Sequence, residues 1–236
     1  MQELTIPIIG IMKSPYKEKF GIPRQPNLVD VESYIEMQWP YNDLLAFEGI
    51  EAFSHLWLLW QFHDNKHQEN SKFRPQVRPP RLGGNKKIGV FATRSMYRPS
   101  PIGLSVVQLK EVKKVGKSVR VYVTGSDLLD GTPIIDIKPY IQYSDSVPEA
   151  QSGYAQDEPV RKYVVWSEQA ELERNQLIQE NKLSEHTIRE LLEVLALDPR
   201  PAYQDDPERV YGMRFADFNI KFSVNDTSVL IEEIEL

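Results

Sequence analysis

Residues 104–125 read LSVVQLKEVKKVGKSVRVYVTG, and this stretch indicates the fold class of the chain. Val119, Val121 and Val123 alternate with polar neighbours, which is the period of a strand with one buried face. Short segments of this kind follow one another with turn residues between them, at residues 104–112, 118–125 and 133–138. No amphipathic helical pattern interrupts them. We therefore expect a mainly β protein whose N-terminal part is a closed, antiparallel-type β-barrel rather than a doubly wound sheet.

Immediately before this stretch, residues 78–104 (RPPRLGGNKKIGVFATRSMYRPSPIGL) combine arginines with residues that control the backbone. The apolar run at residues 88–92 predicts a short buried strand, so Arg94 would lie where a strand leaves the core. Prolines on both sides of Ser100 restrict the backbone next to Arg98. A rigid loop that presents guanidinium groups is suited to binding carboxylates or phosphates. A solvated surface turn is the competing interpretation.

Further toward the N-terminus, residues 4–12 predict a strand and residues 16–30 predict a long irregular loop. Long loops in compact domains are often functional. The tripeptide at residues 23–25, Pro-Arg-Gln, is a second rigidly placed polar cluster within that loop.

Residues 47–62 bring Phe, Leu and Trp in near succession and predict a strand of the barrel wall. His55 and His63 lie on either side of residues 56–62, the most apolar part of this segment. We interpret both as packed or hydrogen-bonded histidines rather than metal ligands, because no other His or Cys has ligand spacing nearby.

Beyond residue 140 the pattern changes. Residues 168–181 and the following segment read as helices with Ser167 and Ser184 as N-caps. Phe218 to Val224 then alternates into a hairpin with residues 229–234. We expect two domains, a β-barrel at residues 1–140 and a smaller α+β domain at residues 141–236.

The chain has 236 residues, no cysteine and a net charge of −6. The charge is uneven, since residues 1–140 hold 19 Lys and Arg against 14 Asp and Glu, and the remainder holds 9 against 20. Residues 66–98 alone hold nine Lys and Arg and one acid, a block that would attract phosphates. No apolar run is long enough for a membrane span, the N-terminus does not resemble a signal peptide, and the absence of cysteine suits the cytoplasm.

Several long motifs occur in one order along most of the chain: GIMKSPYKEKFGIPRQP, EAFSHLW, RPPRLGGN, GVFATRSMYRPSPIGLS, DLLDGTPIIDIKPY, LALDPRPAY and DFNIKFSV. Together they resemble the TsaA-like (TrmO-type) family. Members of this family are S-adenosylmethionine-dependent methyltransferases that act on N6-threonylcarbamoyladenosine at position 37 of tRNA. The resemblance also implies a homodimer with its active site near the subunit interface.

The common nucleotide-binding fingerprints, such as GxGxxG and the Walker lysine, are absent, so a cofactor would not lie in a Rossmann crevice. Carried over residue by residue, the resemblance implies S-adenosylmethionine contacts from Pro23, Arg24, Gln25, His63, Asp64, Arg94, Leu104, Gly131, Thr132, Pro133 and Ile134. It implies no metal.

The resemblance implies that the substrate is the anticodon loop of threonine tRNA, which is already single-stranded. The charge block and the DPRPAY loop motivate a set of RNA contacts, namely Arg78, Arg81, Lys86, Lys87, Arg98 and Arg200. Asp136, His63 and Tyr97 could each accept the N6 proton, and the sequence does not select one.

Two other functions compete with this one. A non-catalytic RNA-binding barrel could use the same basic loops together with Trp57, Trp60 and Tyr97. A small-molecule hydrolase is disfavoured, because the sequence has no nucleophile elbow or metal triad.

Overall fold

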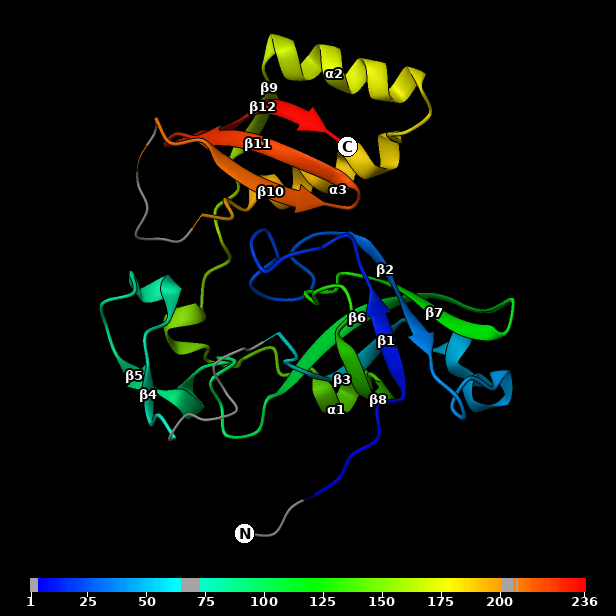
Figure 1. Cartoon of the computed structure of the whole chain (residues 1–236). Helices are drawn as coiled ribbons and strands as arrows, with labels where there is room; N and C mark the ends of the chain where they lie inside the picture. The colour runs from blue at the N-terminus through cyan, green and yellow to red at the C-terminus, as the bar shows by residue number, and fades with distance from the viewer. Residues whose placement is uncertain (1–3, 65–72, 201–205, 207) are drawn as a thin grey trace.

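The computed structural model describes residues 4–64, 73–200, 206 and 208–236. Figure 1 shows two units, one built around a closed sheet from the N-terminal part of the chain and one built around an open sheet with two helices. The mainly β architecture expected from the sequence is confirmed.

The N-terminal sheet closes on itself in the strand order β1-β2-β7-β6-β3-β8, and β8 pairs back with β1. All of these pairs are antiparallel. The strands are β1 (Gly10–Lys13), β2 (Glu32–Met37), β3 (His55–Gln61), β6 (Ile102–Val115), β7 (Ser118–Thr124) and β8 (Pro133–Pro139). This pairing forms the closed barrel that the alternating segments predict.

Alternation puts one face of each strand into the barrel core. Val119, Val121 and Val123 of β7 are fully buried, as are Leu56 and Leu58 of β3. Burying each such side chain contributes roughly 1.5–3 kcal/mol, so the closed core is the main source of stability here.

Some strand boundaries differ from the predictions. The segment expected as one strand over residues 47–62 consists of the 3-10 turns η1 (Leu44–Phe47) and η2 (Ile50–Ala52) followed by β3. The strand expected at residues 4–12 begins only at Gly10. Strand β2 was not predicted, although its Ser33, Ile35 and Met37 alternate inward.

The buried strand predicted at residues 88–92 is wrong. Only Ile88–Gly89 form a strand, β5, which pairs with β4 (Gln76–Val77) outside the barrel. The 3-10 turns η3 (Pro80–Leu82) and η4 (Val90–Ala92) complete this segment. Val90 is buried, but the Phe91 side chain is 69% exposed, so the run packs through one residue only.

The C-terminal unit has the sheet order β10-β11-β12-β9, in which β12 and β9 are parallel. A short helix, α1 (Gln142–Asp145), and the 3-10 turn η5 (Gly153–Ala155) precede it. Its elements are β9 (Tyr163–Trp166), α2 (Glu168–Gln179), α3 (Glu185–Ala196), β10 (Tyr211–Phe215), β11 (Phe218–Val224) and β12 (Ser228–Glu235).

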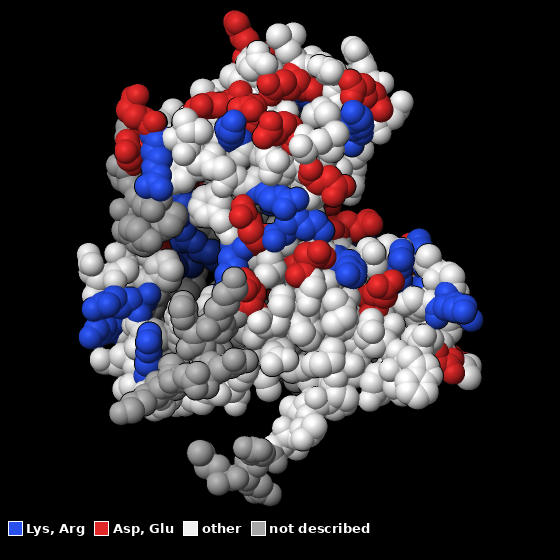
Figure 2. Space-filling model, in the orientation of Figure 1, with Lys and Arg blue, Asp and Glu red and all other residues white. Residues whose placement is uncertain are grey.

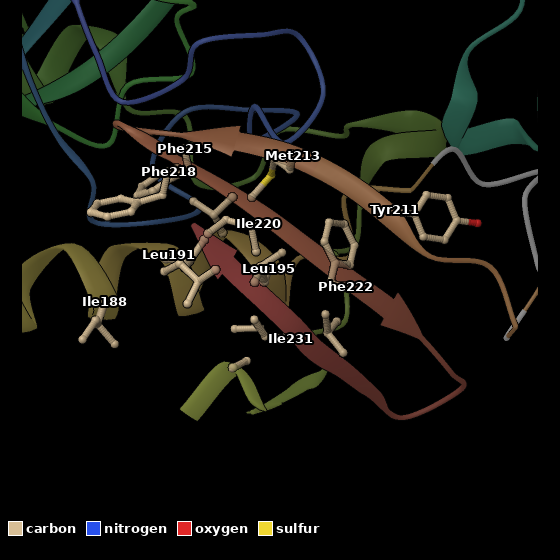
Figure 3. Packing of buried hydrophobic residues seen from close by; sticks show 14 of the residues in the cluster. Ile188, Leu191, Leu195, Tyr211, Met213, Phe215, Phe218, Ile220, Phe222 and Ile231 are labelled. Atoms are coloured by element: carbon tan, nitrogen blue, oxygen red, sulfur yellow. The ribbon is translucent and has the colours of Figure 1, made fainter. Parts of the chain in front are cut away.

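The helix caps predicted from sequence are confirmed. Ser167 Oγ accepts a hydrogen bond from the Ala170 amide, and Ser184 Oγ accepts one from the Thr187 amide, both at 3.0 Å. Each cap satisfies a backbone donor that would otherwise lack a partner in the first turn. Helix α3 then lies against the sheet, and Figure 3 shows its apolar side chains beside those of β11 and β12.

The loop between β1 and β2 joins the two units. Tyr16, Val29 and Val31 belong to the same buried cluster as the C-terminal sheet, although they precede the barrel's second strand. Tyr16 also forms an isolated antiparallel bridge with Phe215 at the end of β10. Glu190 and Glu193 of α3 accept hydrogen bonds from the backbone amides at residues 32 and 30, at 2.6 and 2.8 Å. The loop is therefore fixed by the C-terminal unit as much as by the barrel.

Within the described residues, no helix is long and apolar enough to cross a membrane.

Candidate functional site

A cavity of about 470 Å³ opens beside the barrel, a size typical of small-molecule sites. Its described lining comes from segments far apart in sequence: the β1–β2 loop, the end of β3, the loop before β6, the start of β6, and the β7–β8 turn. The lining residues predicted from sequence are Pro23, Arg24, Gln25, His63, Asp64, Arg94, Leu104 and Thr132. The structure thus brings together eight of the side chains proposed for the cofactor.

The β1–β2 loop contributes one wall. Asn27 holds this loop against the barrel, because its amide donates to the Gly125 carbonyl at 2.8 Å and its side chain donates to the Val106 carbonyl at 3.0 Å. Arg24 donates to the Arg200 carbonyl at 2.9 Å, which ties the wall to the C-terminal unit. The positions of Pro23 and Gln25 therefore depend on both units.

Arg94 reaches across the cavity to that wall. Its Nη1 donates to Gln25 Oε1 at 2.6 Å. The loop that carries Arg94 is stiffened by Arg98, whose Nη1 donates to the Thr93 carbonyl at 2.7 Å and whose guanidinium lies 5.6 Å from the Phe91 ring centre. An arginine held in this way is positioned for an anion without having to order a free chain.

Trp60 and Gly103 form an apolar surface deep in the cavity. The indole packs so closely on Gly103 that a Cβ there would lie 2.3 Å from the ring. Phe62 meets the indole edge to face at 4.4 Å between ring centres. Glycine is therefore required at residue 103 if the indole is to keep this position.

A chain of hydrogen bonds leads from this indole to a carboxylate. Trp60 Nε1 donates to Ser105 Oγ at 3.0 Å, and Ser105 Oγ donates to Asp127 Oδ1 at 2.6 Å. Burial raises the pKa of Asp127 to about 6, while the Ser105 hydrogen bond and the charge of Arg94 oppose the rise. Asp127 lines the cavity and was not among the residues predicted from sequence.

The β7–β8 turn supplies the remaining predicted residues, with mixed outcomes. Thr132 lines the cavity and closes the turn by donating to the Leu129 carbonyl at 2.7 Å. Gly131, at φ +81°, is adjacent to the site, since a Cβ there would lie 3.8 Å from His63 Nε2. Pro133 is not among the described lining residues. Ile134 is a correction, because its side chain is fully buried in the barrel core and is not among the described lining residues.

Other lining residues were not predicted from the sequence to bind the cofactor. They are Lys19, Ile22, Trp60, Phe62, Met96, Ile102, Gly103, Asp127 and Leu129, with Arg98 expected to bind RNA instead. Lys19 forms an ion pair with Asp64 at 3.3 Å across the mouth of the site. The only sequence signal for Ile22 and Asp127 was their position inside the motifs GIMKSPYKEKFGIPRQP and DLLDGTPIIDIKPY, because burial cannot be read from residue type.

Of the six residues proposed to bind RNA, four are exposed together, whereas Arg98 lines the cavity and Arg200 is buried. Arg78, Arg81, Lys86 and Lys87 are exposed around β4 and β5. Figure 2 shows basic side chains gathered over that segment, while acidic side chains dominate the C-terminal unit. Arg81 is partly engaged, since it donates to the Asp157 carbonyl. The part of the charge block at residues 66–72 lies outside the described residues.

Arg200 is a correction. Its guanidinium is 8% exposed and donates from Nε and Nη2 to the two carboxylate oxygens of Asp198, both at 2.9 Å. A side chain buried and paired in this way supports the C-terminal unit instead of contacting RNA. Residues 201–203 of the same motif lie outside the described residues.

The candidate proton acceptors also differ in position. His63 lines the cavity, whereas Asp136 and Tyr97 are not among its described lining residues. Asp136 forms an ion pair with Lys138 at 2.7 Å, and Tyr97 lies under the Arg74 guanidinium. Within the described residues, no group of three or more His, Cys, Asp or Glu has an arrangement that could hold a metal ion. His55 is hydrogen-bonded, as expected, with Nδ1 2.9 Å from Ser54 Oγ.

Comparisons with known proteins match both units of the chain. Residues 11–146 match the model of the tRNA-methyltransferase O N-terminal domain, and residues 159–236 match that of the TrmO C-terminal domain. The chain is 46% identical to the tRNA (adenine(37)-N6)-methyltransferase of Escherichia coli over 96% of each chain. It is 45% identical to the putative S-adenosylmethionine-dependent methyltransferase RcsF of Pseudomonas aeruginosa, over 90% of this chain and 89% of that protein. The crystal structure of TrmO from P. aeruginosa superposes with a TM-score of 0.80, at 33% identity, covering 100% of this chain and 98% of the other.

Proposed function

Because the chain belongs to the tRNA-methyltransferase O family and is therefore an S-adenosylmethionine-dependent tRNA methyltransferase, we propose that its target is N6 of N6-threonylcarbamoyladenosine at position 37. The observation that supports this most strongly is the convergence of separate motif segments on one cavity. A cavity lined by five described segments supports a binding role, whereas a solvated turn would leave its arginines scattered.

The residues present suit S-adenosylmethionine. Arg24 and Arg94 can bind its carboxylate, and the apolar side chains of Ile22, Phe62 and Leu104 can cover its adenine. When bound, this cofactor supplies a methyl group made electrophilic by a sulfonium. The aromatic surface of Trp60 suits such a positive centre.

The protein's contribution to methyl transfer is mainly positioning. Gln25 fixes Arg94, and the Lys19–Asp64 ion pair joins the β1–β2 loop to the segment after β3. These contacts hold the walls at a set separation, which favours in-line displacement and limits the access of water.

The exposed cations around β4 and β5 are proposed to receive the tRNA. Arg78, Arg81, Lys86 and Lys87 would contact phosphates, which fix position without reading sequence. The target base lies in a single-stranded loop, so little unstacking is needed to present it. Threonine tRNA is the expected substrate.

We also propose a homodimer that acts in the cytoplasm. Apolar side chains exposed beside the cavity, including Phe91 and Leu104, support an additional covering surface. Residues 1–140 would carry the cofactor and residues 141–236 would support the loop that binds it. Light scattering on the purified protein measures the oligomeric state.

Mass spectrometry of tRNA nucleosides tests the proposed substrate. A strain lacking this protein should lose the N6-methyl group from the threonylcarbamoyl nucleoside of threonine tRNA, and the intact gene should restore it. The Arg94→Ala variant should fail to restore it. The purified enzyme should methylate tRNA that carries the threonylcarbamoyl group and not the same tRNA with plain adenosine at position 37. Equal methylation of both tRNAs would contradict the proposed substrate.

Calorimetry with S-adenosylmethionine separates the enzyme from a non-catalytic RNA-binding protein. Saturable binding that Arg94→Ala weakens is the expected result, because Arg94 lines the cavity and is held by Gln25.

A further inference from the structure

Asp127 is a partly buried carboxylate that lines the cavity, and sequence motifs alone gave it no role. We propose that Asp127 is the catalytic base that accepts the proton leaving N6 of the target nucleoside. The inference rests on the proposed function, because it concerns the same site and reaction.

The chemistry of the proposed substrate creates the need for a base. N6 of a carbamoylated adenosine lies between the purine ring and a carbonyl, so its lone pair is delocalised into both and it is a poor nucleophile while it holds its proton. In the transfer, the N6–H bond breaks and the proton goes to a carboxylate oxygen of Asp127. The N6 electron pair forms the bond to the methyl carbon, and the carbon–sulfur bond breaks with its electrons remaining on sulfur. The positive charge of the sulfonium is thereby balanced by the loss of negative charge at Asp127, and the proton later passes to water.

The structure holds the Asp127 carboxyl group in a fixed orientation. Ser105 Oγ donates to Oδ1 at 2.6 Å, and Ser105 is itself fixed by Trp60 Nε1 at 3.0 Å. The backbone just before Asp127 is also constrained. Gly125 adopts φ +78° and packs on Asn27, where a Cβ would lie 2.4 Å from the Asn27 side-chain oxygen. A base fixed on both sides can meet a substrate proton at a defined place.

The electrostatic setting matches this role. Burial raises the pKa of Asp127 to about 6, so the group is ionised at neutral pH yet is a stronger base than an exposed aspartate. Tyr16 of the β1–β2 loop and Arg94 of the loop before β6 interact with its charge. Other charged and titratable side chains line the same cavity: Lys19 and Arg24 from the β1–β2 loop, His63 and Asp64 after β3, and Arg98 from the loop before β6.

The other candidates at the cavity are less suited. Asp64 is paired with Lys19, and its side chain is 42% exposed. His63 is exposed at the rim beside Gly131. Asp136 and Tyr97 lie outside the described lining. Asp127 alone among these described groups combines cavity access, burial and a fixed carboxylate.

The first test is the pH dependence of the single-turnover rate with saturating cofactor and tRNA. For the wild type, the rate should fall about tenfold per pH unit below pH 6, because Asp127 becomes protonated, and it should level off above pH 7. Asp127→Asn should lower the rate at pH 7.5 by about 10²–10⁴-fold and abolish the acid limb. Asp127→Glu should retain part of the rate and the limb, since it keeps a carboxylate.

The second test does not depend on turnover. Carboxyl carbon NMR of the free protein should show one aspartate that titrates near pH 6 and disappears in Asp127→Asn. Calorimetry should give that variant an S-adenosylmethionine Kd within about threefold of the wild type, which also shows that it is folded. His63→Gln and Asp136→Asn serve as matched variants and should keep the acid limb.

Several results would overturn the proposal. These are a wild-type rate without an acid limb, a limb that persists in Asp127→Asn or vanishes in His63→Gln, and an Asp127→Asn defect confined to cofactor affinity. The failure of the proposed function gives a different result, because wild-type enzyme would then methylate tRNA with plain adenosine at position 37 as well as tRNA that carries the threonylcarbamoyl group.

Discussion

The two sheets of this protein differ in how the backbone groups of their edge strands are paired. The N-terminal sheet closes on itself, and the described residues of its buried cluster all lie between Met12 and Ile134. The C-terminal sheet is open, and its β10 edge is met by the backbone at Tyr16. Its core also takes in Val29 and Val31 from the β1–β2 loop, which lines the cavity. The barrel is thus self-contained, whereas the C-terminal unit is completed by the segment it supports.

This difference indicates a role for the C-terminal unit. An open sheet edge is a liability that proteins cover, and covering it here immobilises both ends of the β1–β2 loop. The unit then influences the cavity through Arg24 and the loop backbone, without contributing side chains to the described lining.

Phe222→Ala, which tests the link between the two units, should have the largest effect on stability. Phe222 is fully buried, and its ring centre lies 6.2 Å from that of Phe20 and 5.8 Å from that of Tyr211. Its loss should lower the free energy of unfolding by about 3–5 kcal/mol, measured by denaturant titration. Because Phe20 belongs to the β1–β2 loop, which lines the cavity, affinity for S-adenosylmethionine should also fall. The exposed Val160→Ala is the control, and an unchanged cofactor affinity in folded Phe222→Ala would separate the two units functionally.

The charge contrast between the units predicts a smaller change. Combining Arg81→Glu with Lys86→Glu should weaken tRNA binding by about 100-fold near 100 mM salt and lower the salt dependence by about one counterion per residue. The matched change Lys114→Glu, at the exposed end of β6, should leave binding close to that of the wild type. Filter binding across a salt series measures both quantities, and equal salt slopes in all variants would place the RNA elsewhere.

Arg200→Ala tests whether the correction at that residue is right. Loss of its charged hydrogen bonds to Asp198 should cost about 2 kcal/mol of stability. The salt dependence of tRNA binding should stay unchanged, because the side chain is buried. A lower slope with intact stability would return Arg200 to the RNA surface.

Tyr16→Phe should have the smallest effect. The Tyr16 hydroxyl is buried and has no hydrogen-bond partner among the described residues. Removing it should therefore leave stability unchanged or raise it by less than about 1 kcal/mol. Calorimetric unfolding measures this change, and a loss above that size would reveal a partner for the hydroxyl.

The sequence predicted secondary structure best where a regular pattern and a buried face coincide. The alternating valines of β7 and the serine caps of α2 and α3 are examples, because period and capping are local properties. The run at residues 88–92 failed, since an apolar stretch next to glycine can pack through a single residue such as Val90. The predictions for Arg200 and Asp127 failed in opposite ways. Arg200 was expected to contact RNA and is buried, whereas Asp127 was given no role and lines the cavity. In both cases the surroundings of the side chain depend on elements distant in sequence.

The tight packing of Trp60 on Gly103 has a practical consequence. The indole is 9% exposed, borders the cavity and shares a hydrogen-bond chain with Asp127. Its fluorescence should therefore respond to occupancy of the cavity and to the charge of the nearby carboxylate, giving the protein an intrinsic optical reporter. Replacing the other tryptophans (Trp39, Trp57 and Trp166) by phenylalanine would isolate that emission and allow ligand entry to be followed in real time without a label.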